Sequence, residues 1–219
     1  TSKGAETQSQ AKNLVPQLDR KLKALDANEV GSLKTTELLQ AATGLFNRQG
    51  VAGTSLDDVV ESLNLTKGAL YYYFDNKEDL LTSCFDRTLK LTGAYMSAIE
   101  KETSNPLERY ELALRCFVHA HTGDVGPLAV FLGLDIVSED FRKVLANRGR
   151  ELERQYEKWI RQSIDQGLTR QVNPSVARFA LAGSLDWLPK WYQTGGEGSP
   201  KEIADSFASL LLDGLAAQP

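Results

Sequence analysis

The sequence has little of what secreted, membrane-spanning and disulfide-stabilised proteins need. Its 219 residues include two cysteines, Cys84 and Cys116, which are too few for a disulfide framework and are consistent with a reducing compartment. The longest apolar run, from Val125 to Val137, is interrupted by Asp135 and is too short to cross a bilayer. No charged-then-apolar signal peptide opens the chain. We therefore expect a cytoplasmic protein with no membrane partner.

The motifs of common enzyme classes are also missing. We find no hydrolase elbow, phosphate-binding loop or zinc-protease motif. The glycine-rich segment 194–199 follows no strand pattern and precedes no lysine in the register of a phosphate loop. Cys116, His119 and His121 resemble a metal or nucleophile site, yet His121 is displaced from the helix face that the other two share. The sequence therefore predicts neither an enzyme nor a bound metal or cofactor.

Helical periodicity is what the chain does contain, and no strand pattern competes with it. A hydrophobic content of 42% in 219 residues is enough for a sizeable core. Pro189 predicts a kink or an early helix end near Asp186. The fold class is therefore predicted to be all-α. Apolar spacing, caps and breakers predict helices over 34–48, 56–63, 66–74, 77–102, from 106 toward 123, from 126 along the apolar run, and over 139–167, 174–192 and 200–215.

Residues 55–74 contain two short helical patterns separated by a tight turn. Ser55 and Asp58 have the spacing of a capping box at the start of the first helix. Asn64 tolerates the left-handed conformation that a tight turn requires, and Thr66 can cap the second helix. A helix, a turn and a second short helix with exposed side chains form a unit that reads DNA.

Helical phase divides the second of these helices into an inward and an outward face. At about 100° per residue, Leu70 and Phe74 share the inward face and Tyr72 lies nearly opposite. A core cluster of all three tyrosines is disfavoured, because three adjacent helical residues cannot all face inward. Glycine in so short a helix costs up to about 1 kcal/mol relative to alanine, so Gly68 indicates close approach to a partner. We expect bases to be read by Lys67, Ala69 and Tyr72, and phosphates to be held by the tyrosine hydroxyls, helix N-terminal amides, Lys67, and Thr54 or Ser55.

Residues 34–80 resemble the N-terminal domain of the TetR family of bacterial one-component repressors. The resemblance is carried by Phe46, Gly50, Thr54-Ser55, Val59-Val60, Thr66-x-Gly68-x-Leu70-Tyr71-x-Tyr73-Phe74 and Lys77-Glu78-x-Leu80-Leu81. One departure is Glu61-Ser62 before Leu63, where the family's motif usually ends in alanine. The resemblance implies an N-terminal three-helix helix-turn-helix domain whose DNA-contacting positions are Thr54, Thr66, Lys67, Gly68, Ala69, Tyr71, Tyr72, Tyr73 and Lys77.

Charge limits how such a head can bind double-stranded operator DNA. The whole chain has a net charge of −4, and residues 34–80 carry four cations against seven anions. A broad basic surface therefore cannot supply the affinity. We expect it to come from a few placed cations, from helix N-termini and from a dimer that doubles the contacts.

We expect three parts along the chain, which are a mobile N-terminal extension over 1–33, the helix-turn-helix domain over 34–80, and a helical-bundle ligand-binding and dimerisation domain over 81–219. Within the last part, residues 185–192 and 195–205 resemble a branch of the family that regulates fatty-acid, aromatic-acid and sterol breakdown, although Pro189 departs from its pattern. Several members of that branch respond to CoA thioesters. The resemblance implies a small hydrophobic effector such as an acyl-CoA, a fatty acid or an aromatic acid.

A pocket for such an effector should be mostly apolar with few polar groups. Residue type suggests Phe117, Phe131, Tyr156, Trp159 and Trp187 as its walls, and His121, Asp135 and Arg148 as anchors for a head group. Ordinary core packing is the alternative for each aromatic residue. Asp135 stands out because a carboxylate inside an apolar run needs a partner or solvent.

The last two predicted helices carry apolar stripes suited to a homodimer interface. Two copies would build a four-helix bundle across a two-fold axis, and a two-fold head needs a dimer to span half-sites about one DNA turn apart. Packing within one subunit is the alternative for both stripes. The stripes consist of Val176, Phe179, Ala180 and Gly183, and of Ile203, Phe207, Leu210, Leu211 and Gly214.

A second hypothesis keeps the DNA-binding head but makes the other domain a metal or redox sensor. It would use Cys84, Cys116 and the two histidines. Lone cysteines at helical spacing more often pack as small hydrophobic side chains, so the organic effector is preferred.

Overall fold

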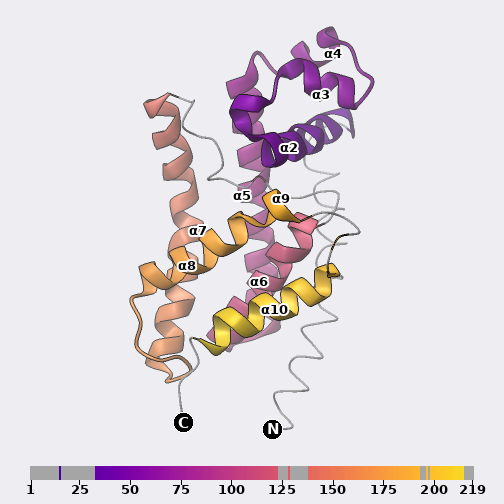
Figure 1. Cartoon of the computed structure of the whole chain (residues 1–219). Coiled ribbons are helices and arrows are strands. Elements are labelled where there is room, and N and C mark those ends of the chain that lie inside the picture. The colour runs from indigo at the N-terminus through magenta and orange to yellow at the C-terminus, as the bar shows by residue number, and fades with distance from the viewer. Residues whose placement is uncertain are drawn as a thin grey trace.

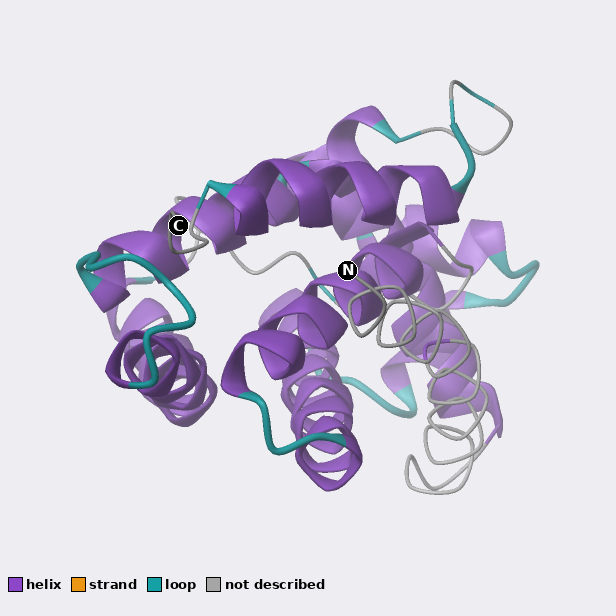
Figure 2. Cartoon of the chain, turned by 90° about the horizontal axis from the view of Figure 1, so that it is seen from below, coloured by secondary structure: helices purple, strands orange, loops and turns teal. Residues whose placement is uncertain are grey.

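The computed structural model describes Val15 and Leu128, residues 33–122 and 138–192, Gly196 and residues 198–214. The described residues form helices and connecting loops without a β-strand, which confirms the all-α prediction (Figures 1 and 2). The predicted extension over 1–33 and the predicted apolar helix from residue 126 fall almost wholly outside the described residues. The helices are α2 (Leu33–Gly53), α3 (Leu56–Ser62), α4 (Lys67–Tyr71), α5 (Lys77–Glu102), α6 (Pro106–Thr122), α7 (Glu139–Asp165), α8 (Pro174–Asp186), α9 (Leu188–Trp191) and α10 (Pro200–Asp213).

The head consists of α2, α3, α4 and the start of α5 (Figure 1). These helices enclose their own apolar core, in which Phe46, Val59, Leu70 and Leu80 are almost completely buried. Gly50 interrupts α2 with φ 79° and ψ 163°, a conformation that glycine adopts without steric cost. The predicted helix end at Gly50 is thus a break, after which three more helical residues lead toward α3.

Helix α5 belongs to both halves of the molecule. It spans 26 residues, or about 39 Å at 1.5 Å per residue, and its predicted bounds are confirmed. The Asn76 side chain caps it by accepting a hydrogen bond from the Asp79 amide at 2.9 Å. Near its start Phe85 packs into the core of the head. Near its end Ile99 packs into a second core, which the end of α5 builds together with α6, α7, α8, α9 and α10. A displacement of α5 would therefore change the packing of both cores.

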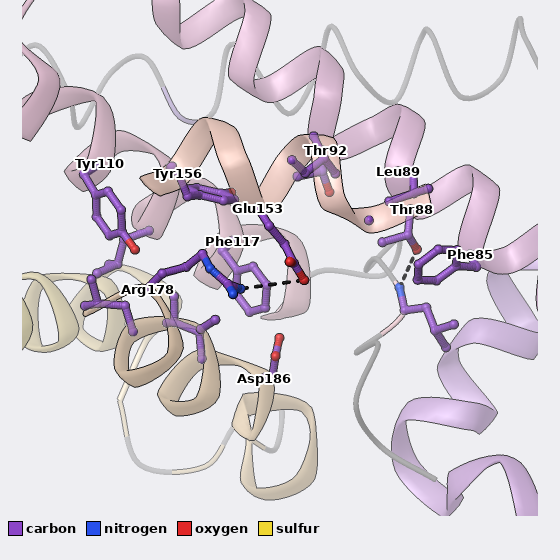
Figure 3. Close-up of a pocket in the computed structure, with 18 residues that line it drawn as sticks. Phe85, Thr88, Leu89, Thr92, Tyr110, Phe117, Glu153, Tyr156, Arg178 and Asp186 are labelled. Atoms are coloured by element: carbon purple, nitrogen blue, oxygen red, sulfur yellow. Dashed lines mark hydrogen bonds and ion pairs between the residues drawn. The ribbon is translucent and has the colours of Figure 1, made fainter. Parts of the chain in front are cut away.

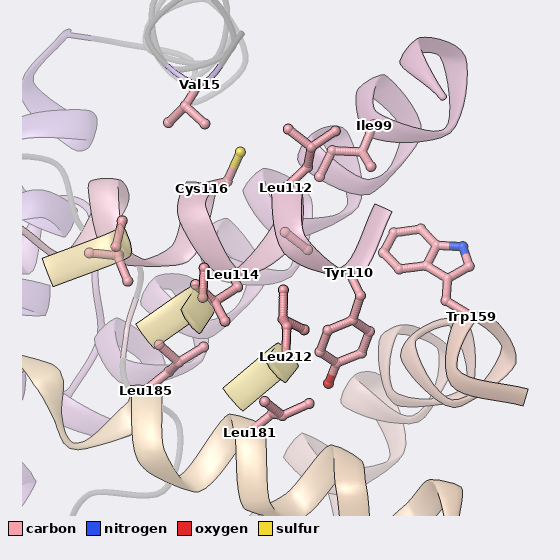
Figure 4. Packing of buried hydrophobic residues seen from close by; sticks show 14 of the residues in the cluster. Val15, Ile99, Tyr110, Leu112, Leu114, Cys116, Trp159, Leu181, Leu185 and Leu212 are labelled. Atoms are coloured by element: carbon pink, nitrogen blue, oxygen red, sulfur yellow. The ribbon is translucent and has the colours of Figure 1, made fainter. Parts of the chain in front are cut away.

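Helix α6 is the centre of the second half. It packs against α5, α7, α8, α9 and α10. Figure 4 shows Leu112, Leu114 and Cys116 of α6 between side chains from the surrounding helices, including Leu181 of α8 and Leu212 of α10. Among the described residues, no helix is both long and apolar enough to cross a membrane.

The boundary between α8 and α9 follows from Pro189. Helix α8 ends at Asp186, and Pro189 occupies the first turn of the short α9, where proline is tolerated. The predicted early helix end near Asp186 is confirmed. The turn directs α9 toward the head, where the Lys190 ammonium donates a hydrogen bond to the Arg48 carbonyl at 3.2 Å.

Candidate nucleic-acid interface and ligand cavity

The α3–turn–α4 unit begins with the predicted capping box. The Asp58 amide donates to the Ser55 hydroxyl at 3.1 Å, and the Ser55 amide donates to the Asp58 carboxylate at 2.7 Å. The hydrogen bond from the Ser55 backbone holds the pKa of the Asp58 carboxyl below its usual value. Asn64 in the turn has φ 53°, as expected for a left-handed residue between two helices.

Helix α4 is shorter than the predicted 66–74. Thr66 caps it, and its regular part ends at Tyr71, because the chain tightens there and the Tyr73 amide bonds to the Leu70 carbonyl at 2.9 Å. The tightening still directs Phe74 into the core of the head beside Leu70. The inward and outward faces therefore follow the helical phase despite the early end.

Tyr72 is the most exposed aromatic side chain among the described residues, with 81% of its surface accessible. Its ring lies against that of Tyr73 in an edge-on arrangement, with centroids 4.9 Å apart. Tyr73 is half-buried against the core of the head, whereas Tyr71 is exposed. A methyl group at Gly68 would meet nothing closer than the Thr66 hydroxyl at 4.0 Å, so packing within the chain does not demand glycine there.

The two predicted DNA-contacting cations differ in their surroundings. Lys67 is exposed and pairs with Asp57 at 2.8 Å, and this hydrogen bond raises the pKa of the Lys67 ammonium. Lys77 is half-buried, and its partial burial lowers the pKa of its ammonium. A DNA phosphate would therefore have to displace Asp57 from its ion pair with Lys67.

Thr54 is a correction to the predicted interface. Its side chain is 1% exposed and its hydroxyl donates to the Gly50 carbonyl at 2.9 Å, so it ties the loop to the end of α2. A hydroxyl so placed does not face a partner. Of the other predicted contacts, Ser55, Thr66, Lys67, Gly68, Tyr71 and Tyr72 are exposed, whereas Ala69, Tyr73 and Lys77 are half-buried.

A cavity of about 170 Å³ lies between α5, α6, α7 and α8 (Figure 3). Its lining is mostly apolar, as expected for a site that binds a small organic molecule. Phe117 and Tyr156, two of the predicted effector contacts, lie in this lining. Helix α5 contributes Phe85, Thr88, Leu89 and Thr92, and α8 contributes Arg178, Leu181, Ala182, Leu185 and Asp186.

Three other predicted effector contacts lie outside the lining. Trp159 is fully buried in the second core, where its indole NH donates to Glu100 at 3.4 Å. His121 stacks on Phe117 with ring centroids 3.9 Å apart, and burial lowers the pKa of its imidazole to about 4. Trp187 is more than half exposed on the surface. Prediction of the effector contacts from residue type alone therefore included two buried residues, Trp159 and His121, and one surface residue, Trp187.

The remaining three predicted contacts cannot be placed in the cavity. Phe131 and Asp135 lie outside the described residues, and so does the side chain of Arg148. Their roles stay predictions.

Sequence reasoning missed the polar end of the cavity, which Arg178, Glu153 and Asp186 form. The buried Arg178 guanidinium pairs with Glu157 at 3.2 Å and with Glu153 at 3.7 Å, and it lies 4.0 Å from the centre of the Phe179 ring. Figure 3 shows the carboxyl of Asp186 pointing into the space beside the Arg178–Glu153 pair. Burial raises the pKa of this carboxyl to about 7.

The predicted dimer stripes divide between surface and core. On α8, Val176, Phe179, Ala180 and Gly183 are all exposed along one face. On α10, Leu210 is 77% exposed, while Phe207 and Leu211 are half-buried and Gly214 just beyond the helix is exposed. Ile203 is a correction, because it is buried within the core of its own subunit. Trp187 and Trp191 add exposed aromatic surface nearby.

The described residues offer little to a metal or redox sensor. They contain no group of three histidine, cysteine or acidic side chains arranged to hold a metal ion. Both cysteines are buried, and burial raises the pKa of the Cys84 thiol to about 12. A buried thiol with so high a pKa reacts poorly with oxidants, because the thiolate is the reactive form.

Comparisons with known proteins cover most of the chain. Residues 38–84 match the family of bacterial regulatory proteins described as the tetR family, and residues 103–215 match the tetracyclin repressor-like C-terminal domain. The HTH-type transcriptional repressor KstR2 of Mycobacterium tuberculosis H37Rv is 20% identical over 195 residues, covering 88% of this chain and 97% of that protein. The negative regulator of the icaADBC biofilm operon, IcaR of Staphylococcus aureus Newman, is 25% identical over 181 residues, covering 80% of this chain and 95% of IcaR.

The structure of AibR in complex with isovaleryl coenzyme A and operator DNA is also similar. It superposes with a TM-score of 0.67 and 25% identity, covering 80% of this chain and 96% of AibR. Similarity therefore extends over both the head and the helices that surround the cavity.

Proposed function

Because this chain belongs to the TetR family of bacterial regulatory proteins, we propose that it is a repressor released from a palindromic operator by a small hydrophobic effector. Its family is one of transcriptional regulators, so the chain is a regulator rather than an enzyme. A protein that controls transcription from chromosomal DNA in a bacterium acts in the cytoplasm.

The exposure of Tyr72 on a capped short helix is the observation that carries DNA binding. The core of the head holds α4 through Leu70 and Phe74, which leaves Gly68 and Tyr72 to face outward. We assign base reading to the outward face of α4, and phosphate contacts to Tyr71, Lys67 and Lys77. Helix N-termini of the head add partial positive charge toward phosphates.

The exposed apolar face on α8 and α10 supports a homodimer. The stripes that contain Phe179 on α8 and Leu210 on α10 cost free energy while they face water, and a second copy would cover them. The two-fold axis of such a dimer relates two copies of α4, as a palindromic operator requires.

The size of the cavity supports an effector that buries a small apolar group. A cavity of about 150 Å³ accommodates one benzene molecule, so about 170 Å³ suits a single ring or a short branched chain. AibR, whose structure contains isovaleryl coenzyme A, supports an acyl group of this size. A bulky carrier such as coenzyme A would have to remain outside the cavity.

Two connections would transmit binding to the head. Thr88, Leu89 and Thr92 line the cavity from α5, the helix that also builds the core of the head. Lys190 and Arg48 form a second contact, between α9 and α2. A ligand that shifts α5 or α8 would change the separation of the two α4 helices and so weaken their fit to the operator.

The test begins with selection of a binding site from random duplex DNA by the full chain. Fluorescence anisotropy then measures the affinity for the selected site before and after addition of isovaleryl-CoA and longer acyl-CoAs. We expect a palindromic site and a rise in Kd of at least about fivefold with an effector of suitable size. Selection of no palindromic site would overturn the DNA-binding proposal, and an unchanged Kd with every acyl-CoA would overturn the acyl effector.

A further inference from the structure

Asp186 is an unusual residue for the wall of an apolar cavity. It is the last residue of α8, where the helix dipole disfavours negative charge. Its carboxyl has no hydrogen bond or ion pair with any described residue, although the residue is half-buried in the wall of the cavity. The charge of this carboxyl acts on the Tyr156 phenol of the same lining, but no hydrogen bond joins the two, and the carboxyl points into the cavity (Figure 3).

The nearby cation does not compensate Asp186. Two carboxylates already hold the Arg178 guanidinium, and the Phe179 ring covers one of its faces. Among the charged side chains of the lining that the structure describes, Arg178 is a single cation against Glu153 and Asp186. An incoming carboxylate would meet Asp186 directly and would compete with Glu153 and Glu157 for Arg178.

We propose that Asp186 selects an effector whose apolar body carries a hydrogen-bond donor, a hydroxyl or an amino group, and that it rejects free carboxylic acids. The donor would satisfy the Asp186 carboxyl, while the apolar body fills the space beside Phe117 and Leu181. This proposal rests on the proposed function, since it specifies the ligand of the same cavity. It separates alcohols, amines and hydroxylated acyl groups from fatty and aromatic acids.

Because burial raises the pKa of the Asp186 carboxyl to about 7, a series of ligands with one skeleton tests the proposal by isothermal titration calorimetry of the full chain at pH 8, where this carboxyl is mostly ionised. Its members are 3-phenylpropanol, 3-phenylpropylamine, 3-phenylpropanoate and propylbenzene, which share a ring of the size that the cavity admits. The wild-type protein should bind the alcohol or the amine at least about tenfold more tightly than the carboxylate, a factor that corresponds to the free energy of one pKa unit. A carboxylate that binds as tightly as both donors would overturn the proposal.

Two variants assign the discrimination to this side chain. In Asp186→Asn the charge is lost but the shape is kept, so the preference over the carboxylate should fall about tenfold. In Asp186→Leu the acceptor is lost as well, and affinity for the alcohol should fall about threefold to tenfold. Asp165→Asn, which removes a carboxylate from the exposed end of α7, is the matched control and should leave the preference unchanged. Circular dichroism and thermal melting verify that each variant is folded.

The outcomes distinguish the two levels of the proposal. An unchanged preference in a folded Asp186→Asn variant would overturn the role of Asp186 alone. Binding of isovaleryl-CoA or of the carboxylate without binding of either donor would leave the repressor function intact and refute the donor selectivity. If no member of the series and no acyl-CoA binds, the cavity is not the effector site, and both the effector proposal and the selectivity fail.

Discussion

Replacement of Asp186 by asparagine alters the charge at the polar end of the cavity while leaving its shape nearly unchanged. Burial raises the pKa of this carboxyl to about 7, from an ordinary value of 3.8. In the unfolded chain the group loses its proton near pH 4, whereas in the folded protein it keeps the proton to about pH 7. The folded state therefore binds more protons over that interval, and the free energy of unfolding falls as the pH rises through it.

The magnitude follows from the size of the shift. At about 1.4 kcal/mol per pKa unit, the full shift corresponds to at most about 4 kcal/mol of lost stability above pH 7. Because the carboxyl keeps partial contact with solvent in the cavity, we expect about 2 kcal/mol. The Asp186→Asn variant should thus match the wild-type protein near pH 4 and exceed its stability by about 2 kcal/mol at pH 8.

The wild-type curve alone would hide this effect, because His121 acts in the opposite direction. Burial lowers the pKa of His121 to about 4, so the unfolded chain binds more protons between about pH 4 and 6.5, and stability rises with pH there. The difference in the free energy of unfolding between Asp186→Asn and the wild-type protein contains no contribution from His121, because both proteins share that contribution.

Urea unfolding followed by circular dichroism at pH 4.5, 6, 7 and 8 provides the measurement. Protein concentration must stay fixed, since dimerisation adds a concentration-dependent contribution to the free energy of unfolding. A stability difference that does not change with pH, or that favours the wild-type protein at pH 8, would refute the assignment of Asp186 as a buried carboxyl without a partner.

Four further predictions concern the DNA-binding face, the dimer and their coupling. Tyr72→Ala should weaken binding to the selected operator by about 1–3 kcal/mol in anisotropy measurements and change binding to random DNA much less; equal losses would count against base reading. Gly68→Ala should leave the melting temperature unchanged or raise it, because the methyl group of the new alanine meets no atom of the chain closer than 4.0 Å. The same methyl group should weaken operator binding, because it prevents the close approach of α4 to the DNA. Leu210→Glu should convert the dimer to a monomer in light scattering, whereas Val144→Glu on the exposed face of α7 should not. Lys190→Met should bind operator and effector as before but show a smaller effect of one on the other, since it loses the hydrogen bond to Arg48; undiminished coupling would assign transmission to α5 alone.

The DNA-binding unit was predictable from the sequence because its determinants are local. The capping box at Ser55, the turn at Asn64 and the phase of Leu70 all depend on neighbours within a few residues. The burial of the Thr54 side chain was not predictable in this way. Its hydroxyl is turned inward by the break of α2 at Gly50, which the sequence located only as a helix end.

The cavity was less predictable because distant segments meet there. Phe117 and Tyr156 were predicted as walls of an effector pocket and line this cavity, whereas Trp159 was chosen by the same criterion and lies in the core. Residue type cannot distinguish a wall from a core position when both are apolar. The one local signal for the polar end was an aspartate at the end of an apolar helix, because its charge is unfavourable there unless something compensates it.

The negative charge of the head, which argued against DNA binding, has a structural resolution. Asp58 carries its charge at the N-terminus of α3, where its carboxylate accepts the Ser55 amide, and Asp79 at the start of α5 accepts the Asp75 amide at 3.0 Å. These charges are compensated by helix N-termini and weaken the field toward DNA less than their number suggests. Asp57 is different, because its ion pair with Lys67 is exposed to solvent and weakened by screening, so a phosphate can replace Asp57 at Lys67. The count of charges over 34–80 therefore overstates the repulsion that DNA would meet at the outward face of α4, where Gly68 and Tyr72 carry no charge.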